Sequence, residues 1–244
     1  QAEDVEEILR VFAEAHGVPL YACGRELTVG IQHHGFGGLQ VSITGLRGLY
    51  QSLDLPLIGR HQAQNAAVAV AALEALSPTG VPHAMVERGL SQVEWPARLE
   101  VVYDTPLILM DGAHNPHAAA HLRETLTELC LGQSIHFLIG MSSDKAVEAI
   151  GKVLGPLGTS VTCTTSRHPR ALEATELARR LSPYCPAVHV IPDAVDAYTY
   201  LLNTVSPNEV IVVTGSLFLV GELRALLRQS HVRPRKAAPL EAAT

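Results

Sequence analysis

The spacing of apolar and polar positions changes several times in the first part of the chain. Over residues 2–16 apolar side chains recur every three or four positions and stop before Gly17, which predicts an amphipathic helix. Alternation over residues 27–44, interrupted by H-H-G-F-G-G, predicts a β-hairpin with His33 and His34 at its turn. The other expected elements of this part are a short strand and two helices, over residues 18–21, 61–76 and 83–92.

The pattern changes again after E-W-P-A-R-L at residues 94–99, where Pro96 interrupts regular structure. Beyond this linker five apolar runs each precede a helical pattern, and they cover residues 107–110, 135–139, 160–163, 188–191 and 210–213. Strand and helix in alternation predict an α/β fold with a mainly parallel sheet covered by helices. Ligands of such sheets meet the loops at the carboxyl ends of the strands, where Asp111, Gly140 and Thr214 fall.

These patterns predict two domains, residues 1–94 and 95–230, followed by a flexible tail over 231–244 that lacks an apolar period. With 47% hydrophobic and 17% charged residues, the chain has enough apolar material for a core. A formal charge of -6 gives no basic excess for nucleic-acid phosphates. No run approaches the roughly 18 apolar residues of a membrane span. We therefore expect neither a nucleic-acid nor a membrane partner.

The four cysteines are widely separated and form no C-x-x-C pair for a metal or a redox couple. We interpret them as buried or half-buried thiols, which suits a reducing compartment and predicts a cytoplasmic protein. Four cysteines are also compatible with two disulfides. They are Cys23, Cys130, Cys163 and Cys185.

The run D-G-A-H-N-P at residues 111–116 follows a predicted strand, and its proline suits the first turn of a helix. Asp111, His114 and Asn115 therefore crowd one strand end. The plainer interpretation is that Asp111 and Asn115 cap the helix while His114 is a solvated loop residue. Because capping needs only one such side chain, we favour a ligand-facing loop.

Two further polar groupings lie on predicted helices. His114, His117 and His121 have a spacing that raises a metal site, but His114 lies before the proline, and neither cysteine nor H-E-x-x-H supports it, so we expect no metal there. His61 and Asn65 stand four residues apart on one helical face. Asn65 is either a satisfied core amide or a group that reads a purine edge.

Five motifs occur in the order G-R-H-Q-x-x-N-A-x-x-A, W-P-A-R-L-E, D-G-A-H-N-P, R-H-P-R-A-L and V-T-G-S-L-F-L-V-G-E. Together they resemble the folylpolyglutamate synthase and dihydrofolate synthase family of the Mur ligase superfamily, over nearly all of residues 1–230. The resemblance implies the rear part of a Mur ligase central ATPase domain at 1–94 and a Rossmann-like C-terminal glutamate-ligase domain at 95–230. It also implies ATP-dependent ligation of L-glutamate to a folate or dihydropteroate carboxylate through an acyl phosphate.

The resemblance assigns roles to individual residues. Asn65 matches the asparagine at the adenine, Arg98 the arginine directed at the ATP phosphates, and Asp111 the aspartate that holds the ribose. A carboxylate can accept hydrogen bonds from two hydroxyls, and an arginine can stabilise charge on phosphate oxygens. His114 and Ser216 match residues near the reaction centre and are the candidate catalytic residues.

Lys145 and Arg170 stand where the family presents basic groups, and the carboxylates of the incoming glutamate are their candidate ligands. Solvated surface cations are the equal alternative. The chain departs from the family twice, with Ala97 in place of the glycine of P-G-R and Ala146 in place of the second aspartate of D-K-D. Because alanine restricts the backbone, we expect a slight shift of Arg98.

The sequence contains no G-x-x-x-x-G-K-[ST] phosphate loop. The resemblance implies that this loop, the Mg²⁺ ligands and a modified lysine precede the point matching Gln1, so ATP and Mg²⁺ are expected cofactors of a longer enzyme. The missing N-terminal portion of the same enzyme is then a partner, and the 244 residues alone are predicted to be inactive. The alternatives are another Mur-ligase-type amide ligase, for a cell-wall precursor or an amino-acid polymer, and a non-catalytic nucleotide-binding module.

Overall fold

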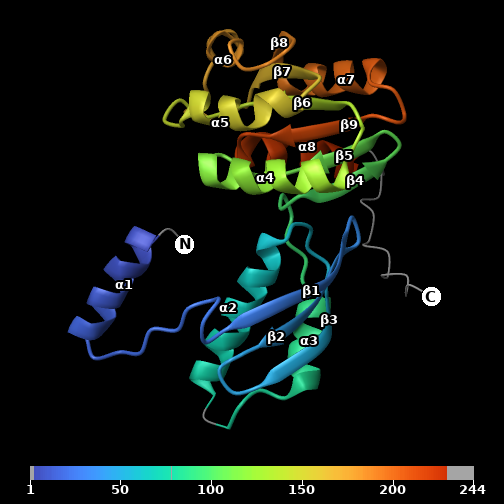
Figure 1. Ribbon diagram of the computed structural model, residues 1–244. Coiled ribbons are helices and arrows are strands. Elements are labelled where there is room, and N and C mark those ends of the chain that lie inside the picture. The colour runs from blue at the N-terminus through green and yellow to red at the C-terminus, as the bar shows by residue number, and fades with distance from the viewer. Residues whose placement is uncertain (1–2, 78, 230–244) are drawn as a thin grey trace. The chain divides into compact units, whose positions relative to one another are not determined.

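The computed structural model describes residues 3–77 and 79–229, and they form two compact units (Figure 1). The first unit consists of the described residues of Gln1–His33, Gln40–Leu55 and His61–Gln92. The second consists of those of His34–Leu39, Pro56–Arg60 and Val93–Thr244. The segments His34–Leu39 and Pro56–Arg60 thus group with the second unit although they precede the linker in sequence. The single domain boundary predicted at the linker does not account for them. The tail predicted at 231–244 lies outside the described residues.

The first unit begins with α1 (Glu3–Ala15), which ends where predicted, before Gly17 with φ +64°. The strand expected at residues 18–21 is wrong, because this segment has no regular structure. Val18 and Tyr21 of this segment are exposed by 52% and 46%, so they contribute little apolar burial that would hold a strand.

A three-stranded sheet follows, in the order β1 (Thr28–Gly35), β2 (Gly38–Thr44) and β3 (Leu49–Leu55). The predicted hairpin corresponds to β1 and β2, but His33 and His34 lie inside β1 rather than at the turn. β3 was not predicted. Its alternation is broken near Ser52, whose φ is +53°.

Two helices complete the first unit, α2 (His61–Leu76) and α3 (His83–Ser91), both within a residue of their predicted bounds. The buried positions of α2 are mostly small, including Ala63, Ala67 and Val70, as expected of close packing. Gln62 and Glu74 are the exceptions, and Glu74 is a charged residue with 0% exposure.

The second unit contains a six-stranded sheet in the order β4-β5-β9-β6-β7-β8. Its strands are β4 (Glu100–Asp104), β5 (Leu107–Met110), β6 (Ile135–Ile139), β7 (Ser160–Thr165), β8 (Val188–Asp193) and β9 (Val210–Thr214). β4 is antiparallel to β5 and the other pairs are parallel, which confirms the predicted α/β fold with a mainly parallel sheet. Only β4, a short edge strand beside the linker, was missed.

Helices cover both faces of this sheet (Figure 1). They are α4 (Pro116–Leu129), α5 (Val147–Leu154) with the short 3₁₀ turn Gly155–Leu157, α6 (Ala174–Leu181), α7 (Ala194–Thr204) and α8 (Leu217–Gln229). Leu109 and Phe137 pack with α4, α5 and α6, whereas Ile108 and Leu138 pack with α7 and α8. Successive strand residues thus face opposite layers, which explains the nearly continuous apolar runs.

All four cysteines are free thiols. Cys130 and Cys163 are buried and Cys185 is half-buried, as predicted, but Cys23 is exposed. Burial raises the pKa of the Cys163 thiol to about 12. No helix within residues 3–77 and 79–229 combines the length and the apolar character needed to cross a membrane.

Candidate functional site

The register of the sheet brings three loops of the second unit to one edge. Met110 pairs with Val213, and Ile139 pairs with Thr214, so β5, β9 and β6 end side by side. Asp111, Gly140 and Thr214 therefore lie at the same carboxyl edge, as the sequence predicts. The loops are in direct contact, because Gly140 N donates to Thr214 O (3.4 Å).

Gly215 makes the close approach between these loops. Its N–H donates to Ala113 O (3.0 Å), and its φ is +95°. A Cβ at this position would come within 2.8 Å of Gly140 O. Only glycine combines this backbone angle with so little space, so the loops after β5, β6 and β9 are packed at their backbones.

Asp111 ties the loop after β5 to the segment that precedes β4. Its Oδ2 accepts a hydrogen bond from Leu99 N (2.9 Å), and its Oδ1 accepts one from Ala113 N (2.8 Å). Gly112 N donates in turn to Ala97 O (2.9 Å). Burial raises the pKa of the Asp111 carboxyl, although both amide donors and the charge of Arg98 act in the opposite direction.

Helix capping in this loop is done by Asn115, whose Oδ1 accepts from Ala118 N (2.8 Å) at the start of α4. The plainer interpretation is therefore correct for Asn115. It is wrong for Asp111, which binds Leu99 and Ala113 and not the amides of the helix.

The segment carrying Arg98 has an unusual backbone. Ala97 has φ +62° and Leu99 has φ +51°, and both side chains are buried. These angles favour glycine, so the departure at Ala97 stores strain at this turn. The guanidinium of Arg98 lies 5.6 Å from the ring centroid of Trp95, as a cation–π contact.

Glu100 supports the same turn from β4. It accepts from Ala97 N (3.1 Å) and pairs with Arg224 of α8 at 2.8 Å. Neither Glu100 nor Arg224 was singled out from the sequence, because the partners are 124 residues apart.

The two candidate catalytic side chains both have local partners. His114 is half-buried, and its Nδ1 lies 2.8 Å from Gly112 O, so Nδ1 carries the proton. Ser216 is 4% exposed, and its Oγ accepts from Phe218 N (3.1 Å) in the first turn of α8. The hydroxyl of Ser216 thus organises the start of α8.

Lys145 and Arg170 lie on loops that are joined by backbone hydrogen bonds. Ser143 N donates to Arg170 O (2.9 Å), and the loops after β6 and β7 form a short bridge there. Lys145 Nζ lies 3.0 Å from an oxygen of Asp144. Lys145 lowers the pKa of Asp144, and the charge of Arg170 contributes to the shift. The structure therefore brings the two loops that carry the predicted basic groups together at their backbones.

Asn65 lies on the first unit, in α2, whereas the other six candidates lie on the second. It is exposed, and its Nδ2 donates to Gln62 Oε1 (2.9 Å). The alternative of a buried core amide is thus wrong.

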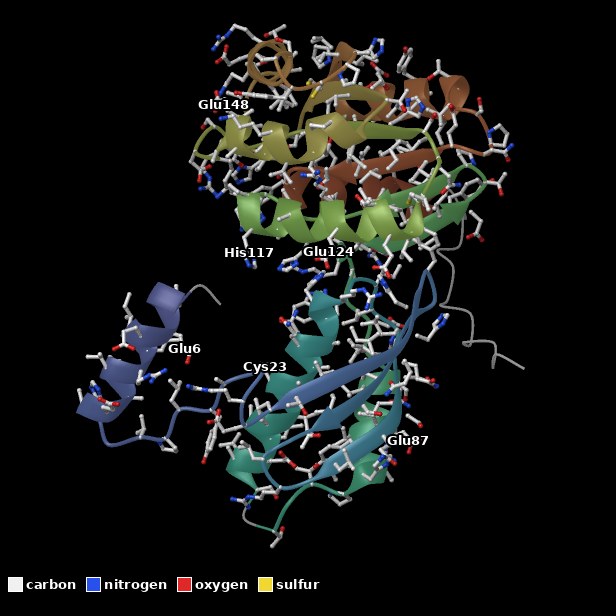
Figure 2. The ribbon with its side chains drawn as sticks, in the orientation of Figure 1. Glu6, Cys23, Glu87, His117, Glu124 and Glu148 are labelled. Atoms are coloured by element: carbon white, nitrogen blue, oxygen red, sulfur yellow. The ribbon has the colours of Figure 1, made fainter. Side chains whose placement is uncertain are left out.

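His117, considered above for a metal site with His121, projects from α4 (Figure 2). The rings of His117 and His121 contact each other edge to face, with centroids 4.6 Å apart. Within the described part of the chain, no group of three or more histidine, cysteine, aspartate or glutamate side chains is placed to hold a metal ion.

Three residues of the second unit form a cluster that sequence reasoning missed. Arg60 makes two hydrogen bonds to the carboxylate of Glu128 on α4, at 2.9 and 2.5 Å. His34 is buried, with Nδ1 3.1 Å from Glu128 Oε2, and its Nε2 accepts from Gly59 N (3.2 Å). Arg60 lowers the pKa of Glu128 to about 2. The only sequence signal was that Arg60 belongs to G-R-H-Q.

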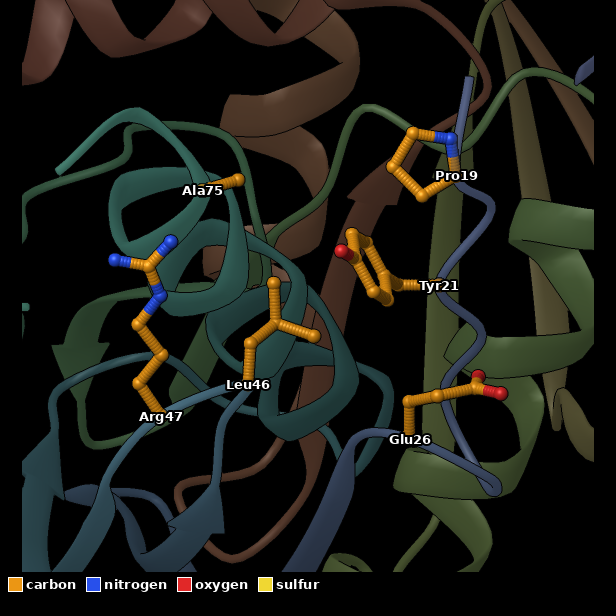
Figure 3. Close-up of a pocket in the computed structure, with 6 residues that line it drawn as sticks. All are labelled: Pro19, Tyr21, Glu26, Leu46, Arg47 and Ala75. Atoms are coloured by element: carbon orange, nitrogen blue, oxygen red, sulfur yellow. The ribbon is translucent and has the colours of Figure 1, made fainter. Parts of the chain in front are cut away.

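A cavity of about 350 Å³ lies in the first unit (Figure 3). It contains none of the predicted site residues. Its lining residues are Pro19, Tyr21, Glu26, Leu46, Arg47 and Ala75.

Comparison with known proteins identifies the class of the second unit. Residues 97–217 match the model of the Mur ligase, glutamate ligase domain family. This match covers the loops after β5, β6 and β7 and reaches the first residue of α8. Residues 97–217 of the second unit therefore belong to the Mur ligase, glutamate ligase domain family.

The chain is 34% identical over 212 residues to the dihydrofolate synthase/folylpolyglutamate synthase of Mycobacterium tuberculosis, covering 78% of this chain and 43% of that protein. It is 27% identical over 225 residues to the Bacillus subtilis protein of the same name, covering 91% and 52%. The structure of M. tuberculosis folylpolyglutamate synthase complexed with ADP and AMPPCP superposes with a TM-score of 0.85 at 29% identity, covering 93% and 53%.

The chain belongs to the folylpolyglutamate synthase and dihydrofolate synthase family, which confirms the resemblance drawn from its motifs. It spans about half the length of the relatives it matches, and it corresponds to their C-terminal part.

Proposed function

We propose that this chain is the adenosine-side and glutamate-side part of an ATP-dependent ligase that joins L-glutamate to the carboxylate of a folate or a dihydropteroate. The observation that carries the proposal is the loop from Asp111 to Pro116, where a carboxylate is fixed by two backbone amides beside Arg98 and His114. The names of the matched relatives and the ADP in the superposed M. tuberculosis structure support the same activity.

Asp111 is suited to hold ribose hydroxyls. Each of its oxygens accepts one amide hydrogen and retains capacity for a further donor. Because the two amides fix the carboxylate in advance, binding a ribose costs little side-chain entropy. Asn65 is assigned to the adenine on its motif alone.

Arg98 is assigned to the phosphates. A guanidinium matches phosphate oxygens with paired donors and remains charged throughout the reaction. Arg98 directly precedes Leu99, and the N–H of Leu99 donates to the carboxylate of Asp111 that is proposed for the ribose. Mg²⁺ is assigned to residues that precede this chain in the longer enzyme, and no step here is derived through it.

The chemistry requires an amine to attack an activated carboxyl. ATP transfers its terminal phosphoryl group to the acceptor carboxylate, and the α-amino nitrogen of glutamate then attacks the acyl carbon, which forms the amide and releases phosphate. Lys145 and Arg170 are assigned to the carboxylates of glutamate. We assign His114 and Ser216 to positions near this reaction centre.

The proposal is tested with the full-length gene product, by following ADP release in the presence of ATP, L-glutamate and either dihydropteroate or tetrahydrofolate. We expect release that depends on both glutamate and one of the acceptors. The 244-residue chain alone, which lacks a phosphate loop, is expected to give only background release. Glutamate-independent release by the full-length protein, or ligation by the 244 residues alone, would contradict the proposal.

A further inference from the structure

Two rings stack where the loop after β7 meets the first turn of α8. The imidazole of His168 and the ring of Phe218 have centroids 3.6 Å apart and planes inclined by 15°. Phe218 keeps 45% of its surface exposed, so the imidazole provides a specific partner at an otherwise open position. Stacked aromatic pairs stabilise a structure beyond the apolar area that they bury.

His168 also fixes the backbone of Arg170. Its Nδ1 accepts a hydrogen bond from Arg170 N (3.2 Å), which requires an imidazole without a proton on Nδ1. The carbonyl of Arg170 is held from the other side by Ser143 N. Because the side chain of Arg170 is exposed, these contacts of its backbone N and O fix the position from which the side chain extends.

A second contact joins the same loop to α8 one turn further along. Arg167 N donates to Glu222 Oε2 (3.0 Å), and Arg167 Nε lies 3.3 Å from Glu222 Oε1. Phe218 itself is anchored through its N–H to the hydroxyl of Ser216. A continuous series of contacts therefore runs from Ser216 through Phe218 and His168 to Arg170.

We propose that His168 is a positioning residue that sets Arg170 relative to Ser216 for binding a carboxylate of L-glutamate. This inference rests on the proposed function and deepens it, because it assigns glutamate affinity to a ring stack and one backbone hydrogen bond. His168 contacts no reacting atom in this role. It acts through the main chain of Arg170 and through the first turn of α8.

The test measures KM and kcat for the full-length enzyme with L-glutamate varied. In His168→Ala both the stack and the acceptor are lost, and KM for glutamate is expected to rise about tenfold, with kcat and the KM for ATP within about twofold. In His168→Asn the amide oxygen can accept from the N–H two residues on, as in an Asx turn, so KM is expected within about threefold of wild type. An unchanged KM in His168→Ala, or an equal rise for ATP, would overturn the inference.

His168→Phe separates the ring from the hydrogen bond, because it keeps the stack and removes the acceptor. We expect a raised KM for this variant, above that of His168→Asn. If His168→Ala does not fold, the comparison of His168→Phe with His168→Asn tests the inference in its place. A wild-type KM in His168→Phe together with a raised KM in His168→Asn would exclude the hydrogen bond to Arg170.

Two controls separate this inference from the proposed function. His189→Ala removes an exposed histidine whose ring centroid lies 5.8 Å from that of Tyr200, and it should leave all constants unchanged. Arg170→Ala should raise KM for glutamate at least as much as His168→Ala. Ligation with a normal glutamate KM in Arg170→Ala would overturn the positioning inference while the ligase activity stands. Absence of ligation in the wild-type full-length enzyme would instead refute the proposed function.

Discussion

Glu74 in the first unit and Asp111 in the second are both carboxylates that accept hydrogen bonds from backbone N–H groups. Glu74 of α2 accepts from Leu46 N (2.5 Å) and from the hydroxyl of Tyr50 (2.9 Å), with a longer contact to Arg47 N (3.4 Å). Asp111 accepts from two amides, one on each oxygen. The bonding looks similar, but the surroundings differ.

Glu74 has no exposed surface, and a Cβ on the neighbouring Gly45 would overlap its carboxylate. Its donors belong to the turn between β2 and β3 and to Tyr50 at the start of β3, so the carboxylate holds this turn together. Asp111 is half-buried, and the charges of Arg98 and His114 act on it. The number of amide donors therefore does not distinguish a structural acid from a ligand-facing one. The exposure that remains at Asp111, next to the guanidinium of Arg98, does distinguish them.

The largest effect is expected for Glu74→Ala. The change leaves the amide of Leu46 and the hydroxyl of Tyr50 without their acceptor and opens a cavity, so we expect a loss of about 3–5 kcal/mol in the free energy of unfolding. Urea unfolding measures it. Glu87→Ala, at a glutamate of α3 whose side chain is 57% exposed, is the matched control and should cost less than about 0.5 kcal/mol. Equal effects would show that Glu74 is not the structural acid of the pair.

Asn115→Ala tests whether the loop after β5 separates capping from ligand binding. Loss of the cap on α4 should destabilise the protein by about 1 kcal/mol. Because Asn115 only caps, the full-length enzyme should keep its KM for ATP. A KM raised as strongly as in an Asp111 variant would mean that the two residues share one role.

Ala97→Gly tests the strain at the turn that Asp111 holds. Alanine at φ +62° costs about 1–2 kcal/mol, and glycine returns about 0.5–1 kcal/mol of that through the greater entropy of the unfolded chain. A net stabilisation of about 0.5–1 kcal/mol is expected, seen as a raised Tm. Leu99→Gly should destabilise instead, because it removes a buried side chain. A lower Tm in Ala97→Gly would contradict the assigned strain.

Glu128 represents a third kind of acid, which is paired with side chains rather than amides. Arg60 and His34 lower its pKa from 4.5 to about 2, so its contribution to stability is present above pH 4.5 and is lost as the pH falls towards 2. The effect is expected to be small, because a third of the side chain is exposed. Unfolding at several pH values should show a weaker acid dependence in Glu128→Gln than in wild type. Identical curves would contradict the pairing.

Much of the second unit was predictable from sequence, because a parallel sheet gives uninterrupted apolar runs and its ligand edge follows from strand direction. The β5, β6 and β9 ends were placed in this way. β3 was missed because Ser52 breaks the alternation. Glu74 carried no signal, because its burial depends on packing against a turn 28 residues away.

The candidate site was predictable where a motif contained the functional group and its surroundings, as in D-G-A-H-N-P. The tie between Asp111 and Leu99 required the fold, since β4 was not expected. The same holds for the stack of His168 on Phe218, which joins residues 50 positions apart. Tertiary partners of this kind leave no periodic pattern in the chain.

The most direct test of the account is the kcat/KM for ATP of the full-length enzyme carrying Asp111→Ala, measured as glutamate-dependent ADP release. His114→Ala is measured beside it, and circular dichroism confirms that each variant is folded. The account predicts a fall of at least about tenfold in Asp111→Ala, because the hydrogen bonds proposed between this carboxyl group and the ribose are lost. An unchanged kcat/KM in a folded Asp111→Ala enzyme would show that this loop does not face the nucleotide.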